Sequence, residues 1–426
     1  MRRAIYRTTL AFMLVALSFT SSYAQKISAD EQKIVDYLDA HMTEAIGTLE
    51  SIVNIESPSE DVAGVKQVGM VFKREFEALG LTARWIDMPP EMQRAGHLVA
   101  ATTGTKGKRV LLLGHIDTVL RGEKFKREGN KAFGTGSSDM KAGDVVLLFA
   151  LKALQATGNL KDSRITVMLT GDEESAGRPI NISRRDMIAA AKESDLALSF
   201  EGTVGNTATI GRRGSSNWRL EVEARTGHSA SIFGASMGSG AIFEASRIVN
   251  QFYEALHQEK YLTFNPSVIV GGTEAALDGP AGTASGKTNV VAAKAIVMGD
   301  LRFISEEQKE AARAKMREIV ARSLPRASSK ITFDDGYPAM TPSAQNYALL
   351  RQMDQVSQDL GFGKIEALDP GARGAGDIAF VSSLIPGLDG IGAGGNGAHA
   401  AGEFVDLESL PKITKKAALL IYRLTR

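Results

Sequence analysis

The stretch from Val110 to Asp117, with the sequence VLLLGHID, decides the fold class. Its four leading apolar residues are typical of a short strand that is buried on both faces, as strands are in a parallel sheet. Similar runs occur at Ile165–Leu169 and Leu196–Phe200, and an amphipathic segment, Lys141–Thr157, lies between the first two. This alternation of strands with a helix predicts a doubly wound α/β layer.

Further helices are predicted on both sides of this layer. Ala29–Ile55 and Gly64–Gly80 carry apolar residues at steps of three and four residues, which is the period of an amphipathic helix. The α/β pattern resumes after Pro338 and continues to a C-terminal helix at Leu410–Leu424. Residues 25–212 and 335–426 are therefore expected to form one doubly wound domain on a mixed sheet.

The segment between these two parts, residues 213–334, has a different pattern. It alternates predicted strands and helices in the order β-α-β-β-α-β, which is that of a ferredoxin-like α+β module. The predicted elements are Trp218–Ala224, Gly238–His257, Ser267–Gly271, Ala292–Phe303, Ser305–Ser323 and Lys330–Phe333. We expect this module to be inserted into the larger domain.

Composition excludes several classes of protein and site. The chain has 426 residues, of which 43% are hydrophobic and 23% charged, so it is a globular protein long enough for two or three domains. It contains no cysteine, which excludes disulfides, thiol nucleophiles and Cys-ligated metals. The formal net charge is only +1, which disfavours nucleic-acid binding because no broad basic surface is available for phosphates.

The first 24 residues are expected to be a secretory signal peptide. Three arginines lie within the first seven residues, Leu10–Phe19 is apolar, and Ser22–Ala24 supplies small residues on either side of a tyrosine before Gln25. A membrane anchor is the alternative, but a run of about ten apolar residues falls short of the ~20 that a spanning helix needs. Cleavage after Ala24 would leave 47 basic against 49 acidic residues in an exported protein, periplasmic or secreted, with no membrane attachment.

Histidines and carboxylates follow the buried strands at the point where each strand ends. In open α/β sheets the carboxyl ends of the strands form the edge at which ligands bind. Taken singly, each of these residues has an ordinary explanation, such as a packed histidine, a helix N-cap or a solvated acidic turn. Their gathering at one edge favours a functional site. The residues are His115, Asp117, Asp139, Glu173, Glu174, Glu201 and, in a glycine-rich loop, His399.

This set of side chains has the composition of a two-metal hydrolytic site. Zinc accepts imidazole nitrogen and carboxylate oxygen as ligands. Two metal ions that share one carboxylate stabilise both the attacking and the departing oxygen of a hydrolysis. An adjacent glutamate that is not a ligand can accept the proton of the attacking water.

Five short motifs resemble those of the zinc peptidases and deacylases of the aminoacylase, succinyl-diaminopimelate desuccinylase and glutamate carboxypeptidase superfamily. They occur in the order of that superfamily, and the resemblance covers nearly the whole chain after residue 24, inserted module included. The sequence is most similar to the exported glutamate carboxypeptidases, in which the third acidic ligand is also a Glu after Ser-Phe. The motifs are Gly114–Val119, Gly136–Gly143, Thr170–Glu174, Ser199–Glu201 and Gly397–His399.

The resemblance implies two Zn²⁺ ions per subunit, with Co²⁺ or Mn²⁺ as alternative metals. His115, Asp139 and Glu201 would hold one ion. His399 and Glu174 would hold the other together with Asp139, which would bridge the two ions.

The resemblance also implies three catalytic residues. Glu173 would be the general base and later the proton donor to the leaving amine. Asp117 would hydrogen-bond the imidazole of His115 and fix its tautomer. The inserted module would be a lid and dimerisation domain, from which His228 would reach the active site of the partner subunit and stabilise the developing oxyanion.

Substrate contacts are implied at Asn289 and Arg302 of the inserted module. Arg373, in the glycine-rich loop before His399, would add a contact to a substrate carboxylate, with a solvated surface arginine as the alternative. Glutamate-specific relatives carry an arginine at the position of Tyr337, so the resemblance does not extend to a preference for glutamate.

Two enzymatic functions and one binding function follow from these observations. The first is a dizinc exopeptidase that releases a C-terminal amino acid from a peptide or an N-acyl amino acid. The second is an aminoacylase or desuccinylase that cleaves an acyl amide, and the metal residues do not separate it from the first. A solute-binding protein of the cell envelope is the third, but it gives no reason for five metal-type residues at one edge. Serine–histidine catalysis is disfavoured because no Gly-x-Ser-x-Gly elbow lies between a strand and a helix.

Overall fold

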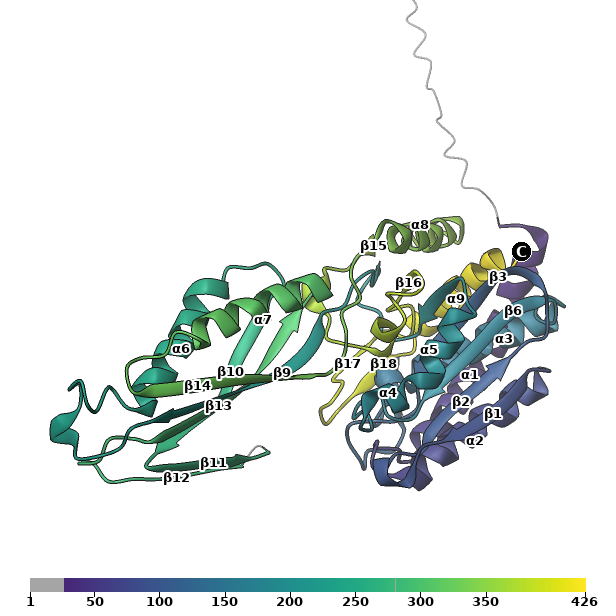
Figure 1. Ribbon diagram of the computed structural model, residues 1–426. Helices are drawn as coiled ribbons and strands as arrows, with labels where there is room; N and C mark the ends of the chain where they lie inside the picture. The colour runs from purple at the N-terminus through teal and green to yellow at the C-terminus, as the bar shows by residue number, and fades with distance from the viewer. Residues whose placement is uncertain (1–26, 280) are drawn as a thin grey trace, which may run out of the picture.

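The computed structural model describes residues 27–279 and 281–426, which form a main body and a smaller module beside it (Figure 1). The predicted signal peptide, residues 1–24, lies outside the described residues. None of the helices within the described ranges combines the length and the apolar character that crossing a bilayer requires.

A six-stranded mixed sheet forms the centre of the main body. Strands β6, β3, β7 and β16 are parallel, whereas β1 and β2 extend the sheet as antiparallel strands at the β6 side. The predicted buried runs all form strands here, and β3 extends the first of them to Lys106–His115. In spatial order the strands are β1 (Thr82–Asp87), β2 (Gly96–Ala101), β6 (Ser163–Thr170), β3 (Lys106–His115), β7 (Leu196–Ser199) and β16 (Gly387–Leu388).

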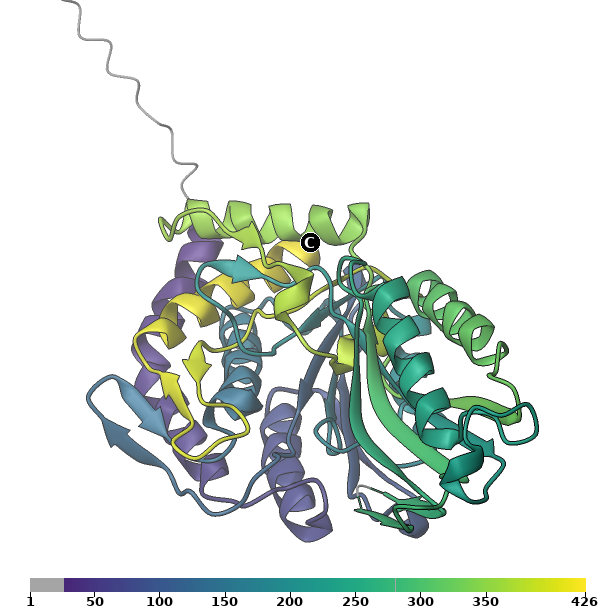
Figure 2. The ribbon, with the colours of Figure 1, turned by 90° about the vertical axis from the view of Figure 1, so that its left-hand side faces the viewer.

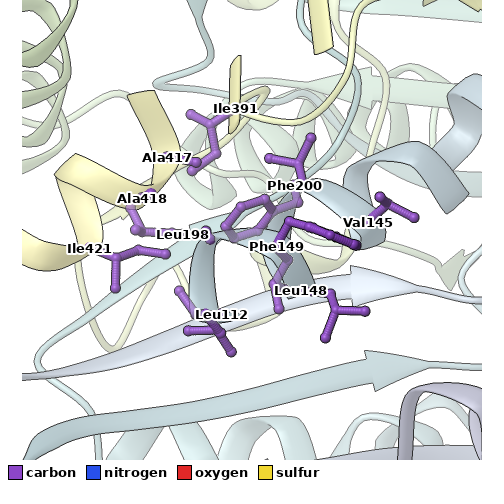
Figure 3. Close-up of a cluster of buried hydrophobic side chains, with 14 of the residues drawn as sticks. Leu112, Val145, Leu148, Phe149, Leu198, Phe200, Ile391, Ala417, Ala418 and Ile421 are labelled. Atoms are coloured by element: carbon purple, nitrogen blue, oxygen red, sulfur yellow. The ribbon is translucent and has the colours of Figure 1, made fainter. Parts of the chain in front are cut away.

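Helix α3 (Ala142–Ala156) lies at the centre of the main core. The sequence predicts an amphipathic helix here, but 12 of its 15 residues are buried, because it contacts β3 while α1 (Ala29–Val53) and α9 (Ser409–Leu424) cover its other sides. Figure 3 shows this core, with Phe149 of α3 and Phe200 among side chains from β3 and α9. Helix α2 (Val62–Ala78) packs against β1 and β2.

The smaller module is a four-stranded antiparallel sheet with two helices, and its chain order is that of a ferredoxin-like unit. It has its own hydrophobic core around Trp218, Phe252 and Met316. An additional hairpin, which the sequence analysis did not predict, joins its second and third strands. Its elements are β9 (Gly214–Ala224), α6 (Ala241–Leu256), β10 (Thr263–Gly272), β11 (Glu274–Asp278), β12 (Ala281–Ser285), β13 (Lys294–Phe303), α7 (Glu306–Val320) and β14 (Ala327–Asp335).

The chain leaves the main body and returns to it through two connectors that lie side by side. Arg212 and Met340 exchange two backbone hydrogen bonds of 3.0 Å each. Closer to the small module, the amide of Ser215 donates to the carbonyl of Tyr337 at 2.8 Å. The two connectors therefore form a short antiparallel ribbon between the main body and the small module.

Several short elements complete the main body, and α8 extends over its top in the view of Figure 2. A small four-stranded sheet, β17-β18-β5-β4, brings the glycine-rich C-terminal loops next to the loop before α3. These remaining elements are β4 (Lys126–Glu128), β5 (Lys131–Phe133), α4 (Ile180–Ser183), α5 (Arg185–Lys192), β8 (Thr207–Ala208), α8 (Ala344–Asp359), β15 (Glu366–Ala367), β17 (Gly395–Asn396) and β18 (Phe404–Asp406).

Candidate metal centre

The carboxyl edge of the main sheet carries the polar residues that the sequence analysis placed there. His115 is the last residue of β3, and Glu201 follows β7 by two residues. Glu174 lies in the loop after β6. Asp139 and His399 come from loops outside the sheet, the first just before α3 and the second between β17 and β18.

Asp139 lies between the two imidazoles. Its Oδ1 atom is 3.3 Å from Nε2 of His115, and its Oδ2 atom is 3.1 Å from Nε2 of His399. It does not cap α3, because that helix begins only at Ala142 and its N-cap position is Lys141. The carboxylate is thereby left free to face both histidines.

Two further carboxylates complete a group around each imidazole. Oε1 of Glu201 lies 3.6 Å from Nε2 of His115. Oε2 of Glu174 lies 3.0 Å from Nε2 of His399. The structure thus brings together all five side chains that the sequence analysis named as metal ligands, in two groups that have Asp139 in common.

The donor atoms at this centre fit a pair of divalent metal ions. Nε2 of His115 and Oε1 of Glu174 are buried, and neither has a hydrogen-bond partner among the described residues. Buried polar atoms without partners are costly unless a ligand satisfies them. Imidazole nitrogen and carboxylate oxygen are the donors that zinc accepts.

Protons on the histidines balance the negative charge when no cation is present. The carboxylates of Asp139 and Glu174 raise the pKa of His399 to about 10. Burial opposes the charged form of His115, but the nearby carboxylates of Asp117 and Asp139 outweigh it and raise its pKa well above the usual range. Burial also raises the pKa of Glu174 to about 7. The carboxylates of this site therefore stabilise positive charge placed between them.

Glu173 has a carboxylate that no hydrogen bond engages in the described part of the chain, while its main chain is held on both sides. Its amide donates to Oδ1 of Asp117 at 3.0 Å, and its carbonyl accepts a hydrogen bond of 2.5 Å from the hydroxyl of Tyr337. Burial raises the pKa of this carboxyl group well above its usual range. Raised basicity and a fixed main chain suit a residue that accepts and releases a proton.

Asp117 contacts more than the imidazole that the sequence analysis assigned to it. Its Oδ1 atom lies 3.4 Å from Nδ1 of His115, whereas its backbone carbonyl is closer, at 3.1 Å. Its carboxylate accepts hydrogen bonds of 3.0 Å from the amides of both Glu173 and Glu174, and one of 2.6 Å from the hydroxyl of Ser59. Asp117 thus joins β3 to the loop that follows β6.

Glu403 holds the loop of Asp139 and was missed by the sequence analysis. Its carboxylate accepts hydrogen bonds from the amides of Gly136, Ser138 and Asp139 at 2.7, 2.8 and 2.9 Å. An acidic residue in a polar loop resembles a surface residue, yet Glu403 is only 4% exposed. Its place four residues after His399 is the one signal in the sequence that could have pointed to it.

A cavity of about 330 Å³ opens beside this centre and is lined by Asp139, Glu201, Arg373 and Asn396 among others. Nη2 of Arg373 lies 3.8 Å from Oε2 of Glu201, and its Nε atom is buried with no hydrogen-bond partner in the described ranges. Arg212, which the sequence analysis did not single out as a site residue, approaches the same Glu201 oxygen at 3.5 Å. Two guanidinium groups therefore face this carboxylate.

Three of the predicted site residues lie on the small module, as the sequence analysis expected. His228 and Asn289 are exposed, and Nδ1 of His228 accepts a hydrogen bond from the amide of Ala230. Arg302 lies on β13 and donates to Asp300 at 2.9 Å. Within the described residues, no hydrogen bond or ion pair joins these three side chains to the metal centre.

The position of Tyr337 is also resolved. Its hydroxyl is directed to the backbone of Glu173 and accepts a hydrogen bond from Arg184 at 2.9 Å. It therefore does not line the cavity that contains Arg373.

Comparison with known proteins agrees with this geometry. The model of the peptidase family M20/M25/M40 matches residues 111–423. The chain belongs to this family. It is therefore an enzyme of the metallopeptidase type, and the resemblance stated from the motifs is confirmed.

Two curated relatives match over most of their length. Carboxypeptidase G2 of Pseudomonas sp. (strain RS-16) is 29% identical, over 99% of this chain and 98% of its own. A succinyl-diaminopimelate desuccinylase of Gluconobacter oxydans (strain 621H) is 25% identical, over 84% of this chain and 91% of its own.

A solved structure supports the fold. The Bacillus subtilis YXEP protein, described as a dinuclear metal binding peptidase from the M20 family, superposes with a TM-score of 0.63. The match is 14% identical in sequence and covers 91% of this chain and 99% of that one. The predicted fold class, a mixed-sheet α/β domain with an inserted α+β module, is confirmed.

Proposed function

We propose that this protein is an exported dizinc exopeptidase that hydrolyses the amide bond releasing a C-terminal amino acid from a peptide or an N-acyl amino acid. The observation that carries the proposal is the placement of Asp139, with one oxygen directed to His115 and the other to His399. The similarity to carboxypeptidase G2 over 99% of the chain supports the carboxypeptidase assignment.

The ligand assignment follows the two groups of side chains. His115, Asp139 and Glu201 would hold one zinc ion, and His399, Asp139 and Glu174 the other. When bound, two such ions polarise the scissile carbonyl group and increase the acidity of the attacking water. Co²⁺ and Mn²⁺ accept the same ligands and are the alternative metals.

Glu173 is proposed as the general base and acid. Its carboxylate, which no hydrogen bond engages among the described residues, would accept the proton of the attacking water and pass it to the leaving amine. Its raised pKa fits this exchange because a carboxylate of ordinary acidity would hold the proton too weakly near neutral pH. Asp117 would keep the base and the neighbouring ligand Glu174 in place through their amides.

Arg373 is proposed to bind the carboxylate of the substrate. It faces the cavity beside the metal centre, and the orphaned Nε atom can donate to an incoming anion. A substrate with a free carboxylate next to the scissile amide would satisfy this donor. Position 337 is a tyrosine and not the arginine of glutamate-specific relatives. The enzyme is therefore not expected to be restricted to glutamate derivatives.

The small module is proposed to act as a lid in a homodimer. Its edge strand β10 and helix α6 expose apolar side chains, including Ile269 at 58%, Tyr253 at 57% and Phe243 at 53%, as expected of a subunit interface. His228, Asn289 and Arg302 would then contact the substrate in the closed dimer, His228 from the partner subunit.

A desuccinylase or aminoacylase activity is the second candidate function, and the desuccinylase similarity favours it. A hydrolysis screen of dipeptides, N-acyl amino acids and N-succinyl amino acids, read by mass spectrometry, separates the two. Release of C-terminal amino acids from dipeptides supports the exopeptidase, whereas turnover confined to acyl or succinyl amides supports the alternative. Binding of such compounds without hydrolysis in the zinc-loaded protein would contradict both and favour a solute-binding protein.

Export is tested separately from catalysis. The proposal predicts that the protein purified from the periplasm or the medium of its own cells begins at Gln25. A protein that keeps residues 1–24 and sediments with membranes would contradict it.

A further inference from the structure

Tyr337 links the connector that returns from the small module to the main chain of Glu173. It follows the end of β14 by two residues. Its hydroxyl donates to the carbonyl of Glu173 at 2.5 Å and accepts a hydrogen bond from Nη2 of Arg184 at 2.9 Å. These two residues are separated from Tyr337 by 164 and 153 positions in the sequence, so the contact depends entirely on the tertiary fold.

The arginine behind this hydroxyl is fixed by charged partners. Arg184 is fully buried, and it donates to Oδ1 of Asp172 at 2.5 Å and to Oδ1 of Asp377 at 2.7 Å. Asp377 also accepts from the hydroxyl of Thr170, the last residue of β6, at 2.6 Å. Buried charged groups with complete hydrogen bonding resist displacement because moving either partner exposes an unpaired charge. Arg184 is therefore a rigid support for the tyrosine hydroxyl.

The aromatic ring of Tyr337 is fixed independently of its hydroxyl. It meets Phe380 edge to face, with 4.9 Å between ring centroids. On the connector side, the amide of Ser215 donates to the carbonyl of Tyr337 at 2.8 Å, and Ser215 pairs with Arg302 across the sheet of the small module. The position of the tyrosine is thus set by the small module as well as by the main body.

We propose that Tyr337 is a positioning residue that holds the main chain of Glu173 in place for proton transfer. The amide of Glu173 is held by Asp117 from β3, and its carbonyl is held by Tyr337 from the returning connector. With the peptide groups on both sides of its Cα atom anchored, the side chain of Glu173 starts from a fixed backbone position, which supports the precise placement that efficient proton transfer requires. This inference rests on the proposed role of Glu173 as the general base.

The variant that tests it is Tyr337→Phe in the full-length mature enzyme. It removes the hydroxyl and keeps the ring against Phe380. Arg184 is not left without a partner, because its Nη2 atom also donates to the carbonyl of Asp172 at 3.1 Å. We therefore expect the variant to fold with an unchanged zinc content. Tyr347→Phe, at a tyrosine of α8 that is 44% exposed, is the matched control.

Two measurements decide the outcome. In the zinc-loaded enzyme, Tyr337→Phe should lower kcat by roughly 10- to 10²-fold with KM within about twofold, since a small displacement of a catalytic group costs rate more than binding. In the metal-free protein, hydrogen–deuterium exchange in residues 172–176 should become faster. Tyr347→Phe should match the wild type in both measurements.

The result that would overturn the inference is distinguishable from failure of the proposed function. Wild-type kcat and exchange in Tyr337→Phe, with Glu173→Gln inactive, would overturn the positioning role alone. A loss of zinc or of thermal stability that accounts for the lower kcat would also overturn it, since it would indicate a general structural role. Full activity of Glu173→Gln would instead contradict the proposed base.

Discussion

The amide of Glu173 donates to the carboxylate of Asp117 at 3.0 Å, so the end of β3 fixes the main chain of the residue that follows β6 by three positions. A second amide, that of Glu174, donates to the other oxygen of the same carboxylate. One aspartate thereby holds the amides of both the proposed base and a proposed metal ligand.

Replacing this aspartate should impair both functions. In Asp117→Asn the NH₂ group of the side chain would face one of the two backbone N–H groups. Two buried donors that face each other are unfavourable because neither has an acceptor. We expect kcat to fall by at least about tenfold and zinc affinity to fall by roughly 10- to 100-fold. Kinetics and competition with a chelator measure the two effects. Asp87→Asn, which alters an exposed aspartate in β1, is the control and should change neither.

Glu173 and Glu174 are adjacent but are expected to do different work. Glu173→Gln keeps the shape of the side chain and removes its ability to accept a proton, so kcat should fall by at least ~10²–10⁴ with two metal ions retained. Glu174→Ala should lose one metal ion, with activity lost as a consequence. Metal stoichiometry and kcat, measured on the two variants, test these assignments. Loss of metal from Glu173→Gln, with two ions kept in Glu174→Ala, would reverse them. Asp172 cannot replace the base because it is buried against Arg184.

Zinc binding to the metal-free protein should release protons. Because His399 has a pKa of about 10, its imidazole is charged near pH 7.5 and must lose a proton before it can bind a metal ion. Zinc affinity should therefore rise as the pH increases from 6 to about 9. Titration calorimetry in two buffers of different ionisation enthalpy measures the released protons. An affinity that is constant over this range would contradict the assignment of His399 as a ligand.

Gly143, near the start of α3, should not tolerate a side chain. A Cβ atom there would lie 2.0 Å from the carbonyl oxygen of Phe200, the residue before Glu201. Gly143→Ala should lower the free energy of unfolding by about 1–3 kcal/mol and weaken zinc binding by displacing Glu201. Gly47→Ala in α1, where a Cβ atom meets nothing within 4 Å, should instead raise the free energy of unfolding by about 1 kcal/mol. Urea unfolding of the two variants tests both expectations.

His228 is exposed on the small module and is expected to act only in the closed dimer. His228→Ala should lower kcat by roughly 10²–10³, the usual cost of one oxyanion donor, without changing zinc content. His41→Ala, at a histidine of α1 in the main body, is the control. Equal activity of the His228 variant, or full activity of an enforced monomer, would contradict the role in the partner's site.

The sequence predicted what depends on local pattern. Burial on both faces is visible in the apolar run before His115, and the end of that run located the functional edge of the sheet. The supporting contacts were not predictable in this way. Glu403 lies 264 residues from Asp139, and Arg212 lies 177 residues from its partner Asp389. Such pairs are created by the tertiary fold, and each residue alone resembles an ordinary charged surface residue.

The paired connectors have a consequence for how this architecture can change. Because Arg212 and Met340 exchange backbone hydrogen bonds, the chain departs from the main body and re-enters it at adjacent points. The whole small module is therefore one long insertion between two paired segments of the main body. A gene encoding this enzyme could gain, lose or exchange the module in one event, and every strand of the main sheet would keep its order and its neighbours.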